Sequence, residues 1–227
     1  MTTALVIEND PAQGLGRAAS WLAEAGMEFD TVRPHLGEAV PNSAGGHDAL
    51  IALGGGRGKD WADDLAGLLG TAVADTTPVL AICSSARMLA TAFGGVVEDR
   101  DEPFGPRMLA KRDAAGRDLI FGPSPMTLDV IRWRRQELVE LPPGATLLAA
   151  SPQGALEVFR VRDTAWGVQS HFEFTPEQLA GFGAFDDRAL AKAAEVDEHI
   201  VATWKPILQR FARVAAGERK ALPVLDA

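Results

Sequence analysis

The sequence predicts an α/β fold with a mostly parallel sheet, and two observations lead to that prediction. Up to about residue 95, short apolar runs of strand length alternate with segments of helical periodicity. Strands that alternate with helices favour a parallel sheet with right-handed crossovers. Beyond that point, short alternating runs are separated by turn residues, which is typical of antiparallel strands. We therefore expect a central, mostly parallel sheet with antiparallel additions and flanking helices.

The first half of the chain supplies the expected parallel strands and the helices between them. The apolar run 4–8 ends at Asn9-Asp10-Pro11, which predicts a short buried strand that stops at a turn. Apolar residues recur at helical spacing over 14–26, and Gly26 ends the pattern. By the same criteria we expect strands at 29–32, 49–53 and 78–82 and helices at 60–75 and 84–93.

The second half supplies the expected antiparallel strands and a helical C-terminal third. The strands are predicted at 107–111, 127–132, 146–150, 156–160 and 165–170. In the C-terminal third an apolar stripe indicates a helix packed on a core; it consists of Ile200, Trp204, Ile207, Leu208, Phe211 and Val214. We expect one domain over 1–227, in which 183–227 is a helical extension packed on the rest.

Composition excludes several classes of protein. Of the 227 residues 47% are apolar and 23% charged, which is typical of a globular chain. The single cysteine excludes an internal disulfide and a cysteine-based zinc cluster. A net charge of −9 without a basic run argues against nucleic acid and anionic membranes as partners. No targeting signal and no apolar stretch of ~18 to 20 residues is visible, so we expect a soluble, cytoplasmic protein.

The single cysteine, Cys83, is the first candidate for chemistry. It follows the buried run 78–82 directly and precedes a predicted helix of small residues. In open α/β sheets ligands bind at the carboxyl ends of the strands, and a helix N-terminus lowers the pKa of a thiol. A sharp strand-to-helix turn there would expose a nucleophile. The alternative is a buried cysteine that packs as a small apolar side chain.

A nucleophilic thiol needs a base, and His171 is the candidate among four histidines. It ends the predicted strand 165–170, and Glu173 follows two residues later. In an extended chain residues i and i+2 point the same way, so this carboxylate can hold the imidazole in one tautomer. Because a His-x-Glu pair alone is a weak signal, a structural histidine stays open as the alternative.

The glycines that follow the strand 49–53 form the third candidate element. Successive glycines let backbone N–H groups approach a ligand closely, so the loop Gly54-Gly55-Gly56 could help to form an oxyanion hole. The residue after Cys83, Ser84, would supply the second N–H. A flexible turn is the alternative, and a phosphate-binding loop is disfavoured because the G-x-x-x-x-G-K-[ST] pattern is absent.

Together these motifs resemble the class I glutamine amidotransferase family, whose pattern is L-x-G-G, then P-V-L-G-I-C-x-G-x-Q, then G-V-Q-x-H-P-E. This chain reads Leu53-Gly54-Gly55-Gly56, then Pro78-Val79-Leu80-Ala81-Ile82-Cys83, then Gly167-Val168-Gln169-Ser170-His171-Phe172-Glu173. The similarity extends over roughly residues 4–180. It implies the three-layer, flavodoxin-like fold of that family.

The resemblance also implies a mechanism. Cys83 would attack a γ-carboxamide, His171 would take and return the proton, and Glu173 would orient the imidazole. A γ-glutamyl thioester would form, ammonia or an amine would leave, and water would release glutamate. The oxyanion would be held by amides of Gly55 or Gly56 and Ser84. We expect no cofactor and no metal ion, a small amide as substrate, and a separate synthetase chain if the ammonia has an acceptor.

Departures from the family pattern gather around the substrate pocket. Ala81 and Ser85 replace glycines where the turn could need a positive φ, and Phe172 replaces the proline of H-P-E. Arg87 stands where the family has glutamine, and the usual H-x-D region reads Arg134-Arg135-Gln136-Glu137. Several changes around one site suggest an altered substrate or lost activity.

From these departures we expect Arg87, Ser85 and Arg135 to bind substrate. A guanidinium binds carboxylate or phosphate through two parallel hydrogen bonds, which would suit an anionic acyl substrate. Alternating strand geometry lets only one of Arg134 and Arg135 face the pocket. Arg87 could instead be a surface arginine paired with an acidic residue. The whole protein could also be a catalytically quiet binding or regulatory module, or a thiol lyase or transferase.

Overall fold

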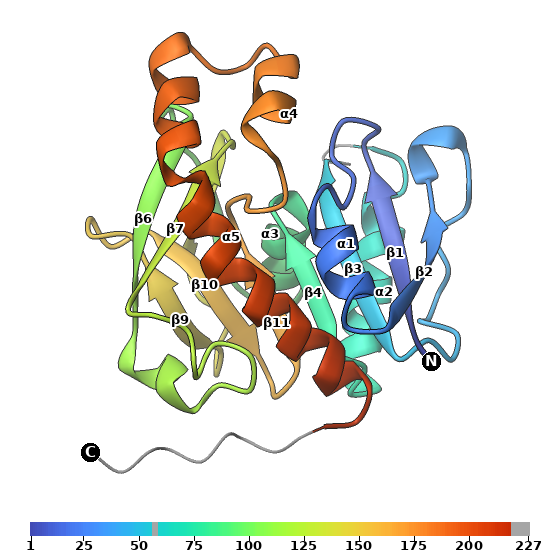
Figure 1. Ribbon diagram of the computed structural model, residues 1–227. Helices are drawn as coiled ribbons and strands as arrows, with labels where there is room; N and C mark the ends of the chain where they lie inside the picture. The colour runs from blue at the N-terminus through green and yellow to red at the C-terminus, as the bar shows by residue number, and fades with distance from the viewer. Residues whose placement is uncertain (56–58, 219–227) are drawn as a thin grey trace.

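A nine-stranded sheet runs through the middle of the molecule, as the computed structural model shows (Figure 1). The structure describes residues 1–55 and 59–218. The strands of this sheet are β1 Thr2–Asn9, β2 Met27–Val32, β3 Ala49–Gly55, β4 Val79–Ile82, β6 Gly105–Lys111, β7 Thr127–Arg132, β9 Thr146–Ala150, β10 Leu156–Val161 and β11 Ala165–Val168. Their spatial order is β2-β1-β3-β4-β11-β10-β9-β6-β7.

The sheet has a parallel and an antiparallel half. The neighbours β2, β1, β3, β4 and β11 pair in parallel. From β11 through β10, β9 and β6 to β7, every pair is antiparallel. The predicted mostly parallel α/β sheet with antiparallel additions is therefore confirmed.

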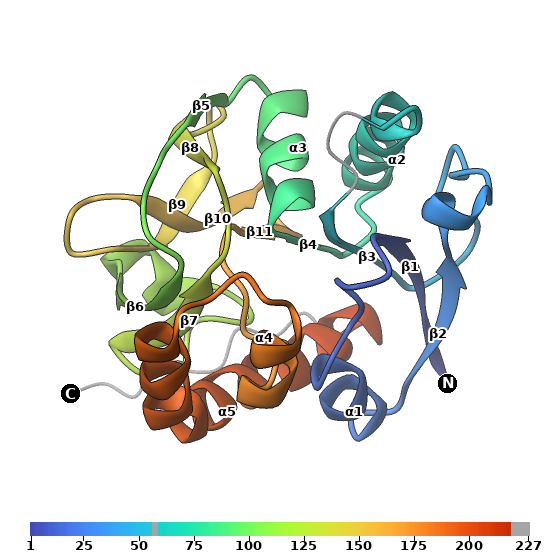
Figure 2. The same cartoon turned by 90° about the horizontal axis from the view of Figure 1, so that it is seen from above.

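Helices cover both faces of the sheet, which makes three layers (Figure 2). On one face lie α1 Ala18–Ala23, α4 Pro176–Gly181 and the long α5 Asp187–Ala215, and on the other lie α2 Ala62–Ala74 and α3 Ser84–Ala92. Short 3-10 helices occupy Pro34–Leu36 and Asp113–Arg117. Because both faces are covered, every residue of β4 is buried, as its unbroken apolar sequence predicts.

The helix α5 belongs to one of the two apolar cores. Its predicted stripe is buried, and the indole of Trp204 is fully enclosed beneath β7. The Trp204 Nε1–H donates to the backbone oxygen of Asp129 at 2.9 Å, so the polar end of the ring is also satisfied. Asp186 caps the helix by accepting a hydrogen bond from the Ala189 N–H at 2.7 Å.

One predicted element differs from the structure, and one observed element was not predicted. The sequence predicts a helix over 14–26, but α1 begins only at Ala18, because Gly16 takes a left-handed conformation with φ +51°. A separate two-stranded sheet, formed by β5 Val96–Asp99 and β8 Gln136–Glu140, is not predicted from the sequence. Most residues of β5 are exposed, so it has no apolar run to mark it, and its partner lies far along the chain.

None of the helices in the described parts of the chain is both long and apolar enough to cross a membrane.

Candidate active site

Cys83 occupies a strained turn between β4 and α3. Its φ of 57° and ψ of −115° lie in a region that non-glycine residues rarely adopt, and such strain costs about 1–3 kcal/mol. The surrounding structure holds the residue there, since the Cys83 N–H donates to the Val168 oxygen of β11 at 2.8 Å. The turn leaves the thiol 5% exposed at the carboxyl end of the parallel strands.

His171 and Glu173 form a buried pair just after β11. The His171 Nδ1 lies 2.6 Å from Glu173 Oε1, and both side chains are almost fully enclosed. The other carboxylate oxygen, Oε2, accepts the Phe172 N–H at 2.8 Å. A two-way backbone bridge to Ile131 at the end of β7 fixes the position of His171. With the Nδ1 proton directed at Glu173, the Nε2 atom is left to meet the thiol.

The Nε2 atom has no hydrogen-bond partner within the described part of the chain, although it is buried. The imidazole of His171 and the thiol of Cys83 nevertheless interact electrostatically, and each shifts the pKa of the other. Burial raises the pKa of the Cys83 thiol, but the positive charges of His171 and Arg87 outweigh it and lower the pKa to about 6. Burial lowers the pKa of His171, but Glu173 and Cys83 raise it to about 10. Between these values the pair is a thiolate and an imidazolium.

Arg87 provides the second positive charge beside the thiol. It lies one helical turn after Cys83 on α3, and its Nη2 atom is 3.9 Å from the sulfur. The side chain is not an exposed arginine paired with an acidic residue: it is only 7% exposed, and no described carboxylate pairs with it. Its Nε and Nη1 atoms are buried without a hydrogen-bond partner among residues 1–55 and 59–218. Of the predicted arginines, this one reaches Cys83.

The glycine loop approaches Cys83 from the end of β3. At Gly54 a Cβ atom would lie 3.2 Å from the Cβ of Cys83, so the close approach favours glycine. Gly55 has a φ of +83°, and its oxygen accepts the Ser84 hydroxyl at 2.5 Å, which ties β3 to the start of α3. The first N–H groups of a helix lack partners within it, so the Ser84 N–H is free of the helix ladder. Gly56 lies outside the described residues.

Ser85 and Ala81 are placed differently from the expectation. Neither residue has a positive φ, so the predicted strain at these two positions is wrong; the strain is at Cys83 itself. Ser85 is fully buried, and its hydroxyl donates to the Leu53 oxygen at 2.6 Å and accepts from Asn9 Nδ2 at 3.3 Å. The side chain therefore points into the sheet, where it holds α3 against β3, and the expectation that it binds substrate is not supported.

Arg134 and Arg135 point in opposite directions, as strand alternation predicts. Arg134 is buried and donates to Glu157 at 2.6 Å and to the Ser170 hydroxyl at 2.7 Å, so its charge is compensated. Arg135 is exposed, pairs with Asp101 and lies over the Phe104 ring at 4.5 Å. Neither guanidinium contacts Cys83 among the described contacts, so the expected part of Arg135 in substrate binding stays a prediction.

Two neighbours of the site were missed at the sequence level. The backbone oxygen of Trp133 lies 3.9 Å from the Cys83 sulfur. The centroid of the Trp133 ring lies 5.8 Å from the centroid of the His171 ring. Gln136 begins β8 and lies within the segment 134–137 that stands in place of the family H-x-D region. Strand alternation over 134–140 could have located Gln136, but β8 has no strong apolar pattern.

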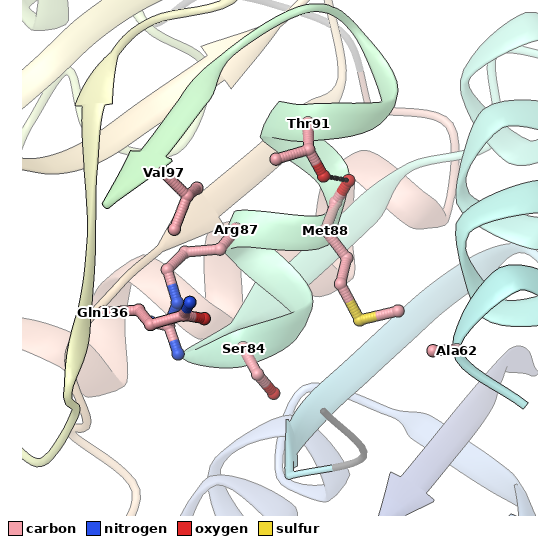
Figure 3. A pocket seen from close by; sticks show the side chains of 7 residues that line it. All are labelled: Ala62, Ser84, Arg87, Met88, Thr91, Val97 and Gln136. Carbon is pink, nitrogen blue, oxygen red and sulfur yellow. Dashed lines mark hydrogen bonds between the residues drawn. The ribbon is translucent and has the colours of Figure 1, made fainter. Parts of the chain in front are cut away.

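A cavity of about 260 Å³ lies against one face of α3, which begins directly after Cys83 (Figure 3). It is lined by Ala62, Ser84, Arg87, Met88, Thr91, Val97 and Gln136. The side chains of Arg87 and Gln136 converge from α3 and β8 at one end of it (Figure 3). Phe172, the residue in place of the family proline, has no part in the cavity lining; its ring stacks on Trp204 of α5 at 4.1 Å.

The fold and the turn at Cys83 define an α/β protein with a cysteine between a parallel strand and the following helix. This is the position of the cysteine in the amidotransferase motif that the sequence resembles. A model of the family "Glutamine amidotransferase class-I" matches residues 19–189. The chain belongs to this family, as the sequence motifs predict.

Relatives and solved structures agree with this membership. The chain is 24% identical over 197 residues to the glutamine amidotransferase-like protein YfeJ of Salmonella typhimurium, which covers 82% of each. It is 27% identical over 210 residues to gamma-glutamyl peptidase 4 of Arabidopsis thaliana, covering 84% of this chain and 78% of that protein. A glutamine amidotransferase from Methylobacillus flagellatus has the same fold, with a TM-score of 0.80, 19% identity and coverage of 100% and 99%. A structure from Thermoplasma acidophilum, described as one subunit of a GMP synthase, matches with a TM-score of 0.67, 21% identity and coverage of 96% of both chains.

Proposed function

We propose that this protein is a cysteine-dependent amidohydrolase that cleaves a γ-carboxamide, in glutamine or a γ-glutamyl compound, through a thioester. The observation that supports this proposal most strongly is the buried Cys83 thiol, whose pKa is lowered to about 6 beside His171 and Arg87. A thiolate at neutral pH is the nucleophilic form of cysteine. Perturbed pairs of this kind are typical of functional sites.

The first half of the reaction makes the thioester. The Cys83 sulfur attacks the amide carbon, a C–S bond forms, and the carbonyl oxygen becomes an oxyanion. The His171 Nε2–H donates its proton to the amide nitrogen, the C–N bond breaks, and ammonia or an amine leaves. Glu173 keeps Nδ1 protonated throughout, because the 2.6 Å hydrogen bond fixes that tautomer.

The second half restores the thiolate and the imidazolium. Neutral His171 takes a proton from water, and the resulting hydroxide attacks the thioester carbon. The C–S bond then breaks to give the Cys83 thiolate and a carboxylic acid, which loses its proton to solvent. The N–H groups of Ser84 and of Gly55 are the proposed oxyanion donors in both halves, since the N–H of Ser84 begins α3 beside the thiol. A separate proposal is that the ammonia passes to a partner synthetase. The fold that this chain shares with a structure described as one subunit of a GMP synthase supports it.

The proposal is tested by ammonia release from glutamine and from a panel of γ-glutamyl amides. We expect release by the wild-type protein and loss of at least about 1,000-fold in Cys83→Ser, which keeps the size of the side chain. Arg213→Gln, on the exposed last turn of α5, serves as the matched control and should retain full activity. If no amide gives Cys83-dependent release, the hydrolase proposal is wrong and a quiet binding module is favoured.

A further inference from the structure

The guanidinium of Arg87 has no carboxylate partner among the described residues, and two of its nitrogen atoms are unpaired. The residue is only 7% exposed, and its Nε and Nη1 atoms donate to nothing among the described residues. Buried polar groups are nearly always hydrogen-bonded, and a buried charge is strongly disfavoured unless it is paired. The thiolate meets only Nη2, at 3.9 Å. Two donors are therefore left for a ligand.

The cavity beside Arg87 offers this ligand space but no second charge. Four of its lining residues share one face of α3, and the others come from α2, β5 and β8. No aspartate or glutamate is among the lining residues that the structure describes. The one amide in this lining, Gln136, donates its Nε2–H to Asp99 at 3.0 Å, which leaves its oxygen as an acceptor. The volume of about 260 Å³ suits a small molecule.

We propose that the substrate is the ω-amide of a small dicarboxylic acid that carries a free carboxylate but no ammonium group. This inference rests on the proposed amide hydrolysis at Cys83. The carboxylate would pair with the charge of the Arg87 guanidinium and accept a hydrogen bond from Nη1, one of its two unpartnered nitrogen atoms. The amide carbon would then have to reach the thiol, which lies 3.9 Å from Nη2 of the same guanidinium and one residue before Ser84 of the cavity lining.

Free glutamine fits this cavity less well. Its ammonium group and its carboxylate are attached to the same carbon, so binding the carboxylate at Arg87 brings the ammonium close to the guanidinium. Like charges repel, and none of the described lining residues supplies a carboxylate to compensate. A substrate without the ammonium, such as glutaramate, avoids this repulsion; its hydrolysis consumes one water and yields glutarate and ammonia.

Three amides with chains of equal length separate the effect of the carboxylate from the effect of the ammonium group. Glutaramate has the carboxylate alone, glutamine has both charges, and valeramide has neither. We expect kcat/KM for glutaramate to exceed that for each of the others at least tenfold. Arg87→Gln, which installs the family residue, should abolish the advantage of glutaramate over valeramide, whereas Arg213→Gln should keep it. Equal or faster hydrolysis of glutamine, or an unchanged preference in Arg87→Gln, overturns the proposal.

Alkylation of the single cysteine tests the anion site without any turnover. Iodoacetate and iodoacetamide attack the same thiolate, so the ratio of their rates does not depend on the thiol pKa. Arg87 should favour the anionic reagent, and Arg87→Gln should lower the ratio at least fivefold while Arg213→Gln leaves it unchanged. A lowered ratio without hydrolysis of any amide would refute the proposed function but keep the anion site. An unchanged ratio overturns the anion site even if amides are hydrolysed.

Discussion

Replacing Arg87 by methionine removes one positive charge from the side of Cys83 and keeps an apolar stem in the same place. The Nη2 atom lies 3.9 Å from the sulfur in a site that is nearly closed to solvent. Because a positive neighbour stabilises the thiolate, its loss must raise the thiol pKa. In the wild-type protein this pKa is about 6, so the variant should become reactive only at higher pH.

The size of the shift follows from Coulomb's law. Two unit charges about 4 Å apart interact by about 1 kcal/mol in water and about 4 kcal/mol at an effective dielectric constant of about 20. One pKa unit corresponds to about 1.4 kcal/mol, so the thiol pKa should rise by about one to three units. The remaining shift comes from His171, which the variant retains.

The assay is the rate of iodoacetamide alkylation as a function of pH, followed by the mass of the intact protein. The chain has one cysteine, so each alkylation event reports Cys83. We expect a midpoint near pH 6 for the wild-type protein and for Arg213→Gln, and a midpoint at least one unit higher for Arg87→Met. A wild-type midpoint near pH 9, or equal midpoints for wild type and Arg87→Met, would refute the electrostatic reasoning.

Three further predictions concern the support of the site. Glu173→Gln keeps the shape of the buried partner but not its charge, so ammonia release should fall at least about 100-fold with little change in melting temperature. Gly16→Ala places a Cβ against the backbone oxygen of Glu173 at φ +51° and should lower the free energy of unfolding in urea by about 2 kcal/mol more than Gly26→Ala. Phe172→Ala removes a ring stacked at 4.1 Å on Trp204 and should lower that free energy by about 3–5 kcal/mol.

Each of these predictions has an outcome that contradicts it. Full activity of Glu173→Gln would mean that the carboxylate does not orient the imidazole. Gly26, the control position, also has a positive φ (+83°), but a Cβ there meets nothing within 4 Å. Equal losses in both variants would therefore exclude the collision at Glu173. A loss below about 1 kcal/mol in Phe172→Ala would show that α5 does not depend on this contact.

The elements that could be predicted best are those with unbroken local patterns. β7 and β9 have the bounds that their alternating runs predict, and β4 begins within one residue of the expected start. Such strands can be recognised locally, because successive side chains alternate between the two faces of the sheet and apolar side chains predominate on a buried face. β5 and β8 were missed since their pairing depends on residues about 40 positions apart and their apolar pattern is weak.

In the candidate site, too, some features could be predicted from local sequence and others could not. The elbow at Cys83 and the spacing of His171 to Glu173 are local features of the sequence, so motif reading could locate them. The direction of a side chain is not local: Ser85 and Arg87 are two residues apart on α3, yet one hydroxyl bonds into β3 while the other side chain reaches the cavity. Helical geometry separates such neighbours by about 200°, and the packing of α3 against the sheet and β8 decides which face lines the cavity.

The sequence by itself therefore determined the α/β class, the family and the position of the single thiol, because strand and helix periodicity and the order of three motifs are properties of the chain. Only the tertiary structure decided which of the three candidate arginines lies beside the Cys83 sulfur. Arg134 is compensated by Glu157, and Arg135 pairs with Asp101 at the surface. Arg87 alone among these three lies beside the sulfur with donors to spare, because packing of α3 against β4 and β8 buries it without a described carboxylate in reach.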